Sequence, residues 1–125
     1  MIHHVSLGTS NMSRARAFYD AVMGELGMRR TFDAEEAVGY GAGITVFSLN
    51  LPTDGAPATP GNGVHIAFEV EKRVAVDAFY RTAIEHGGIS DGEPGLRPEY
   101  DANYYAAFVR DPDGNKIEAL TFVAA

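Results

Sequence analysis

Three side chains that can bind a metal ion occupy related places in the two halves of the sequence. His4 and His65 are 61 residues apart, and each lies in a short stretch where apolar and polar residues alternate as in a half-buried strand. Glu118 lies in the otherwise apolar run 117–123, where an unpaired carboxylate is costly. Two imidazoles and one carboxylate form the facial ligand set that leaves positions on Fe(II), Mn, Zn, Ni or Co open to water or substrate. The sequence therefore predicts a divalent metal site of His4, His65 and Glu118.

Strand alternation also predicts which faces these side chains share. His4 falls on the face of Ser6 and Gly8, and His65 on the face of Ala67 and Glu69. If the two strands meet across a pseudo-twofold axis, the faces converge around a ligand. The competing interpretation is structural, since an isolated histidine on a strand is more often part of the framework than a metal ligand. We expect the remaining histidines, 3 and 86, to be structural or solvent-exposed.

An internal repeat determines the expected architecture. The 61-residue offset that aligns the histidines also aligns the Ala-Phe-Tyr triplet 17–19 with 78–80 and Gly27 with Gly88. Each half then predicts a strand, a helix with an apolar stripe, and three further strands. The expected strands are 2–8, 28–33, 37–41, 44–51, 64–71, 89–93, 104–110 and 116–123. The expected fold class is α+β with two βαβββ modules in one domain of residues 1–125, module one about 1–58 and module two about 63–125.

Local signals mark where these elements begin and end. Ser10 or Asn11 can accept a hydrogen bond at the start of the first helix, and Gly27 and Gly87 suit the left-handed conformation that ends each helix. The Gly- and Pro-rich segment 55–63 has the composition of a connector. The segment 111–115, Asp-Pro-Asp-Gly-Asn, predicts a hairpin turn.

Composition excludes several classes of function. The chain has 125 residues, 46% of them hydrophobic, and no cysteine, which excludes thiolate metal sites, disulfides and cysteine nucleophiles. Its formal charge of −7 argues against nucleic acid and anionic membranes as partners. It has no apolar run of the length of a membrane span and no leader-like N-terminus, so we expect a cytoplasmic protein.

Three segments carry a resemblance to a known family. HHVSLGTSNMSRARAFYDAVMGELG, HIAFEV and FVRDPDGNKIEAL resemble the vicinal oxygen chelate superfamily, also called the glyoxalase/bleomycin resistance family, over essentially the whole chain. Segment 97–120 is similar to a bacterial glyoxalase-like subgroup. The resemblance implies a cupped mixed sheet, usually in a homodimer, that holds a divalent metal such as Zn, Ni, Mn or Fe. It also implies a small-molecule substrate that binds the metal through two adjacent oxygens.

Carried over by position, the family's metal ligands fall on His4, His65 and Glu118. Glyoxalase I has a fourth, acidic ligand in the first module, and aligning residues 43–46 with 116–119 puts Thr45 there, or Phe47 after a two-residue slip. Without that carboxylate, proton transfer on a hemithioacetal loses a basic group beside the metal. The three-ligand set looks more like the fosfomycin-modifying or ring-cleaving branches, although the chain is shorter than the usual two-domain dioxygenases.

The sequence favours a glyoxalase-like metal-dependent lyase or isomerase in which Glu118 is both ligand and transient base. The alternatives are a metal-free ligand-sequestering protein of the bleomycin-resistance type, a fosfomycin-modifying or ring-cleaving enzyme, and a structural dimer without a ligand. The expected substrate-pocket residues are Arg97, Tyr100, Tyr104, Arg110 and Thr45. Two of these have competing interpretations, because Arg110 could brace the 111–115 turn and Tyr104 could simply pack or face solvent.

Overall fold

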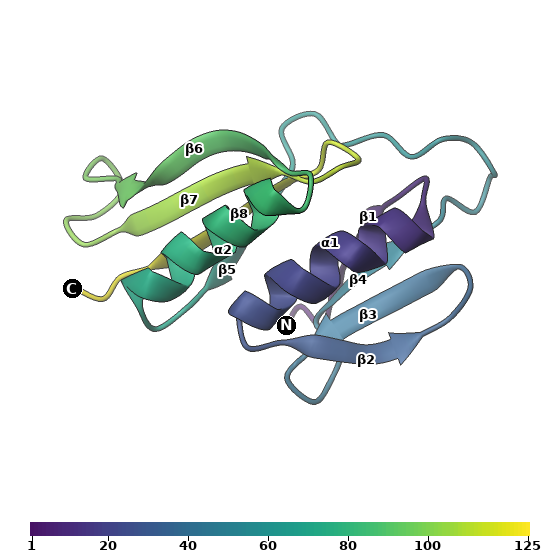
Figure 1. Cartoon of the computed structure of the whole chain (residues 1–125), viewed down its shortest axis with the longest axis horizontal. Helices are drawn as coiled ribbons and strands as arrows, with labels where there is room; N and C mark the ends of the chain where they lie inside the picture. The colour runs from purple at the N-terminus through teal and green to yellow at the C-terminus, as the bar shows by residue number, and fades with distance from the viewer.

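The computed structural model describes residues 1–125, and its secondary structure repeats the pattern βαβββ (Figure 1). The first module contains β1 (Val5–Gly8), α1 (Met12–Glu25), β2 (Arg29–Asp33), β3 (Ala37–Gly41) and β4 (Phe47–Asn50). The second contains β5 (His65–Glu69), α2 (Arg73–Glu85), β6 (Ile89–Leu96), β7 (Tyr105–Arg110) and β8 (Lys116–Thr121). The α+β class and the two modules are therefore as predicted. Neither helix has the length and apolar character needed to cross a membrane.

The eight strands form two mixed sheets with the same internal order. The first sheet runs β1-β4-β3-β2 and the second runs β5-β8-β7-β6. In each sheet the first and last strands of the module pair in parallel, and the other pairs are antiparallel. No strand pairing joins the two sheets, so a continuous cup is not closed by hydrogen bonds within one chain.

The ends of the elements follow the local signals in the sequence. Asn11 caps α1, because its side-chain oxygen accepts a hydrogen bond from the Arg14 amide at 3.0 Å. The Ser10 hydroxyl instead accepts one from the amide of Ala58, at 2.7 Å, and so ties the connector to the first module. Gly27 and Gly87 follow the two helices with φ of 78° and 98°, the left-handed conformation that glycine adopts without strain.

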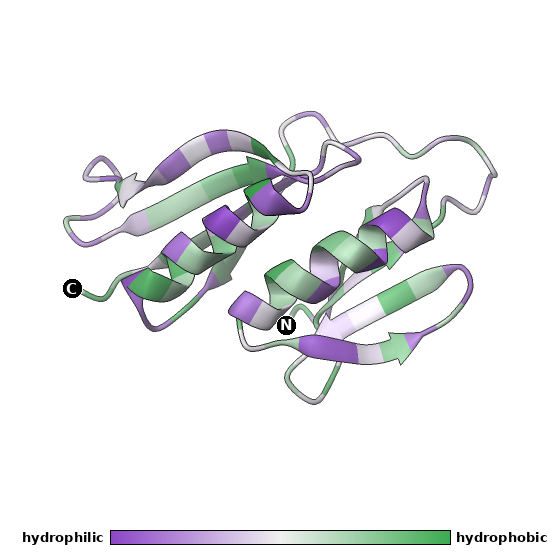
Figure 2. Cartoon of the chain, in the orientation of Figure 1, coloured by the Kyte–Doolittle hydropathy of each residue, from purple (hydrophilic) through white to green (hydrophobic).

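One core joins the modules on the helix side of both sheets. α1 lies on the first sheet, α2 on the second, and the two helices contact each other (Figure 1). Phe47 of β4 meets Phe68 of β5 edge to face, with 5.3 Å between ring centroids. Hydrophobic residues are prominent along β7 and α1 (Figure 2). The aromatic residues of the helix stripes, Phe18, Tyr19 and Phe79, are at most 1% exposed, as expected for core positions.

The turn between β7 and β8 forms a polar connection between the modules. Asp113 accepts hydrogen bonds from the Thr9 hydroxyl at 2.6 Å, the Ser10 amide at 3.0 Å and the Arg14 guanidinium at 2.7 Å. Asp111, two residues earlier, accepts one from the hydroxyl of Tyr19 at 2.6 Å. The predicted hairpin turn is confirmed, and its side chains hold β8 in place against the first module.

Candidate functional site

The residues best suited to bind a metal or transfer a proton lie on the open face of the second sheet. Alternation along β5 turns Ile66 and Phe68 towards the core, which leaves His65 on the opposite face. On β8, Glu118 has Ala67 of β5 as its register partner on one side and Phe108 of β7 on the other. His65 and Glu118 therefore emerge side by side on the face that no helix covers.

Glu118 is a buried carboxylate without a permanent cation. It is 2% exposed. Its Oε1 lies 3.1 Å from His65 Nε2, and its Oε2 accepts a hydrogen bond from the Tyr104 hydroxyl at 2.6 Å. No Lys or Arg side chain lies within ion-pair distance, and the His65 side chain is 44% exposed. Burial, and next the hydrogen bond to Glu118, raises the pKa of the Tyr104 phenol well above its usual value, so it stays protonated and donates.

His4 lies apart from this pair. It directly precedes β1 in the first sheet, its side chain is exposed, and its Nδ1 lies 2.8 Å from Nδ1 of His3. No group of three or more His, Asp or Glu side chains in the chain is placed to hold a metal ion. Within one chain the two faces expected to converge do not do so: His65 and Glu118 come together, and His4 remains on the other sheet.

The strand registers correct the position that corresponds to Glu118 in the first module. Ser6 pairs with Ser48, whereas Ala67, 61 residues after Ser6, pairs with Glu118. The counterpart of Glu118 is therefore Ser48 and not Thr45. The sequence alignment slipped by three residues because it began at Gly43, whereas β4 begins only at Phe47 after an irregular segment. Ser48 is not a carboxylate either, so the first module lacks the fourth acidic ligand.

In the first module, both the observed counterpart of Glu118, Ser48, and the expected one, Thr45, are hydroxyl residues. Ser48 is 3% exposed, and its hydroxyl lies 2.6 Å from that of Ser6 and 3.0 Å from the side-chain oxygen of Asn50. Thr45 lies just before β4, where its hydroxyl contacts that of Thr31 at 2.6 Å. Thr45 therefore belongs to the first module, and the chain does not bring it to His65 and Glu118.

A cavity of about 420 Å³ opens beside Glu118. Its volume falls within the range of about 300–1,000 Å³ that is typical of small-molecule sites. Two expected pocket residues, Tyr100 and Tyr104, line it. The sequence analysis missed two others, Phe108 and Lys116. Strand alternation could have found Lys116, because it lies two residues before Glu118 and so faces the same way. The complete lining is His65, Tyr100, Tyr104, Phe108, Lys116 and Glu118.

The two expected pocket arginines serve the framework of the second module. Arg97 donates to the backbone carbonyls of Glu93 at 2.8 Å and Gly95 at 2.9 Å. Arg110 donates to the carboxylate of Asp91 and to the carbonyl of Gly114, both at 3.1 Å, so it braces the turn after β7. Neither guanidinium lines the cavity.

The two adjacent tyrosines at the start of β7 have different partners. Tyr104 turns towards the cavity and Glu118, whereas the Tyr105 hydroxyl donates to the carboxylate of Asp77 on α2 at 2.6 Å. Strand alternation alone separates them, since successive side chains lie on opposite faces. Tyr104 is therefore the one available to a ligand.

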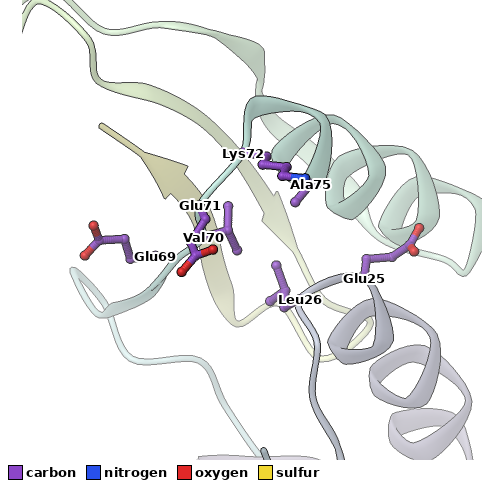
Figure 3. A pocket seen from close by; sticks show the side chains of 7 residues that line it. All are labelled: Glu25, Leu26, Glu69, Val70, Glu71, Lys72 and Ala75. Atoms are coloured by element: carbon purple, nitrogen blue, oxygen red, sulfur yellow. The ribbon is translucent and has the colours of Figure 1, made fainter. Parts of the chain in front are cut away.

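A second groove, of about 380 Å³, lies where α1 ends and where β5 runs into α2 (Figure 3). Leu26, Val70 and Ala75 supply its apolar part. The charged groups around it are Glu25, Glu69, Glu71 and Lys72. It contains no histidine, and it shares no residue with the cavity beside Glu118.

Comparisons with known proteins give a consistent result. The family model described as the Glyoxalase/Bleomycin resistance protein/Dioxygenase superfamily matches residues 1–119. A glyoxalase/bleomycin resistance protein from Albidiferax ferrireducens is 35% identical, with a TM-score of 0.85 over 94% of this chain and 95% of that one. A glyoxalase-related enzyme from Fulvimarina pelagi is 20% identical, with a TM-score of 0.77 over 97% and 87% of the two chains.

A structure described as lactoylglutathione lyase from Agrobacterium tumefaciens is also similar in fold. It is 20% identical, and its TM-score is 0.68 over 97% of this chain and 92% of that one. No protein of curated function matches the sequence.

Proposed function

The chain belongs to the glyoxalase/bleomycin resistance protein/dioxygenase superfamily, and on that premise we propose that it is a metal-dependent enzyme of the lyase or isomerase type. Its substrate would be a small polar molecule that binds the metal through two adjacent oxygens. The observation that carries the proposal is the pair of Glu118 and His65, 3.1 Å apart on an open face. A buried carboxylate with no Lys or Arg beside it is costly, and a divalent cation would offset that cost.

The donor atoms suit the proposed metal. Neutral imidazole nitrogens and a carboxylate oxygen are ligands that Zn, Ni, Mn and Fe share. Many members of the superfamily use divalent metals. The residues that would hold the ion are His65 and Glu118 of one chain and His4 of a second chain, because His4 lies on the other sheet.

A homodimer supplies the missing ligand. Each sheet has one face without a helix, and a two-fold axis can set the first sheet of one copy against the second sheet of its partner. Such an interface is isologous, so it creates two equal sites, each with His4 from one copy and His65 and Glu118 from the other. The exposed apolar side chains available to an interface include Ile2, Phe32, Ile44, Val64 and Leu96.

Each group at this site would then have its own role in the reaction. A metal bound here would act as a Lewis acid, polarising the substrate oxygens and stabilising a developing enolate or alkoxide. Tyr104 holds Oε2 of Glu118, so Oε1, which faces His65, would be the oxygen that binds the metal and, once released from it, accepts a proton from the substrate. With substrate bound, Phe108 and the two tyrosines of the cavity would shield the reacting atoms from water.

Metal content tests the proposal directly. Untagged protein purified without chelator should contain close to one Zn, Ni, Mn or Fe per chain by mass spectrometry, and His4→Ala and His65→Ala should each lose it. Mixing these two variants after joint unfolding and refolding tests the shared site. Half of the dimers would then contain one copy of each variant, and each such dimer would have one intact site out of two. This restores about a quarter of the wild-type metal content. A site within one chain would restore none.

One observation favours the branches with three ligands over an orthodox glyoxalase. Ser48 stands at the position symmetric to Glu118, where glyoxalase I would need a carboxylate. Once metal is loaded, activity on epoxides or catechols should exceed activity on hemithioacetals. Absence of metal, with no gain on adding these ions back, would reject the enzyme and leave a ligand-sequestering protein as the leading account.

A further inference from the structure

Aromatic rings form the wall of the cavity beside Glu118. The Tyr104 ring meets Tyr100 with 5.1 Å between centroids and Phe122 with 5.2 Å, both edge to face. Edge-to-face contacts of this kind are a favoured arrangement of aromatic rings. Phe108 lines the same cavity as the direct register partner of Glu118. The cavity therefore offers an apolar surface next to the reacting pair.

The wall has few hydrogen-bond donors to offer a ligand. The Tyr104 hydroxyl is engaged by Glu118 at 2.6 Å, so Tyr104 presents its ring to the cavity. Apart from His65 and Glu118, the remaining polar groups of the lining are the Tyr100 hydroxyl and the Lys116 ammonium. A sugar or another polyol would leave most of its hydroxyls unpaired against such a wall.

Lys116 places an incompletely paired positive charge in the cavity. Its ammonium lies 5.1 Å from the centre of the Phe108 ring. The carboxylate oxygen in its ion pair, Oδ2 of Asp91, is 3.6 Å away, beyond hydrogen-bond length, and this oxygen already accepts from Arg110 at 3.1 Å. Arg97 also lies over Phe108, at 5.5 Å, but it donates to backbone carbonyls. Lys116 is the charge left for a ligand.

We infer that this cavity selects a planar aromatic or conjugated anion, with its ring against Phe108 and Tyr104 and its anionic oxygens on Lys116. The inference deepens the proposed function and rests on it in taking that ligand as the substrate. The volume of about 420 Å³ accommodates one substituted ring, since a cavity of about 150 Å³ already holds benzene. Because Glu118 lines the same cavity and the overall charge is −7, the anionic group must lie on the Lys116 side, with the apolar ring between it and Glu118.

Three probes separate the contributions of charge and ring. Benzoate carries both, cyclohexanecarboxylate carries only the charge, and benzamide carries only the ring. In metal-free wild-type protein, titration followed by NMR should show benzoate binding about 5- to 10-fold more tightly than either of the others, the size expected for one charge-assisted contact or one stacked ring. Equal binding of all three would overturn the inference, as would no binding at all.

The chain provides a matched control, because its only other lysine is Lys72 in the second groove (Figure 3). Lys116→Gln should weaken benzoate about tenfold and leave benzamide unchanged, and Lys72→Gln, with the same change in net charge, should alter neither. Phe108→Leu should remove the preference for benzoate over cyclohexanecarboxylate. Equal losses of benzoate affinity in the two lysine variants would show a general charge effect and overturn the assignment of Lys116 to the ligand site.

A measurement on the wild-type sequence covers the case in which a variant fails to fold. Reductive methylation with ¹³C-formaldehyde gives each lysine its own dimethylamine resonance. Benzoate should shift the Lys116 resonance and leave that of Lys72 in place, and the reverse would overturn the inference. All these titrations use metal-free protein. Their failure while metal content remains would therefore overturn the ligand class alone, and loss of metal content would reject the proposed function separately.

Discussion

Two buried carboxylates in the second module should respond in opposite ways to removal of their charge. Glu118 and Asp111 are both 2% exposed. Glu118 has two side-chain partners, one of them the half-exposed His65, and no backbone donor. Asp111 accepts four hydrogen bonds, from the Tyr19 hydroxyl at 2.6 Å, the Asn115 side chain at 3.0 Å and the amides of Asn115 at 2.8 Å and Asp113 at 2.9 Å.

Glu118→Met should therefore stabilise the metal-free protein. The substitution removes a desolvated charge and fills its place with an apolar side chain of similar size, and replacements of this kind are often stabilising by about 1–4 kcal/mol. It leaves no buried charge behind, since the His65 side chain reaches solvent, and the Tyr104 hydroxyl can turn to water in the cavity. We expect a gain of about 1–2 kcal/mol, which raises Tm by about 3–8 °C for a chain of this length.

Asp111→Asn should have the opposite effect. An amide cannot accept from all four donors, because one of its two atoms is itself a donor that faces the Tyr19 hydroxyl and the Asn115 side chain. We expect a loss of about 2–3 kcal/mol of unfolding free energy from the unsatisfied groups. Burial raises the pKa of the Asp111 carboxyl above its ordinary value although four donors hold it, so the expected loss comes from the donors that Asn leaves unsatisfied and not from removal of the charge.

Urea unfolding of metal-free wild type and both variants, followed by far-UV circular dichroism, measures both effects. Equal m-values would show that the changes are in stability and not in the unfolded state. A loss of more than about 1 kcal/mol in Glu118→Met would refute the view that this carboxylate awaits a cation, because breaking a satisfied buried pair costs about 3–5 kcal/mol. Adding Zn²⁺ or Ni²⁺ should raise the midpoints of wild type and of Asp111→Asn, which keeps the proposed ligands, and should leave that of Glu118→Met unchanged.

Three further predictions follow from the contacts described above. Tyr104→Phe should weaken metal binding about 10- to 100-fold by isothermal titration calorimetry, as loss of a hydrogen bond to a metal ligand does. Tyr105→Phe removes an equally short bond to α2 and should leave metal binding unchanged. Equal effects of the two substitutions would contradict the role of Tyr104. Asp113→Ala should lower the free energy of unfolding in urea by about 2–4 kcal/mol, because it removes three hydrogen bonds between the modules. An unchanged midpoint would mean that these three bonds do not stabilise the contact between the modules. Burial acts to raise the pKa of Asp20, but hydrogen bonds from Arg30 and Tyr40 outweigh it and hold that pKa below its ordinary value. Its contribution to stability is therefore present above about pH 4 and lost as the pH falls. The free energy of unfolding of Asp20→Asn should depend less on pH in that range than that of wild type, and parallel curves for the two proteins would disprove this.

The repeat in the sequence was sufficient to predict the two modules because the signals that define them are local. Alternation marks strands, an apolar stripe marks each helix, and the left-handed glycines at 27 and 87 end the helices where expected. The turn at 111–115 was likewise predictable from its own residues. The sequence analysis did not predict that Asp111 and Asp113 tie this turn to the first module, because their partners lie about 100 residues earlier in the chain.

The candidate site was predictable only in part. Alternation put His65 on the face of Ala67, and the register of the structure pairs Ala67 with Glu118, which sets His65 and Glu118 on one face of the second sheet. Thr45 was wrongly predicted to be the counterpart of Glu118. The prediction aligned the two halves by residue type, whereas the strand register depends on where β4 begins. Arg97 and Arg110 have side chains suited to an anion, but nearby carbonyls and Asp91 occupy them.

The sequence by itself determined which residues of one strand share a face, since that depends only on the period of two along the strand. It did not determine which faces meet. The packing of α1 on α2 and of Phe47 on Phe68 sets the two sheets side by side, and this leaves His4 away from His65 and Glu118. That arrangement follows from non-local burial of apolar surface, which no spacing along the chain encodes, and only the tertiary structure decided it.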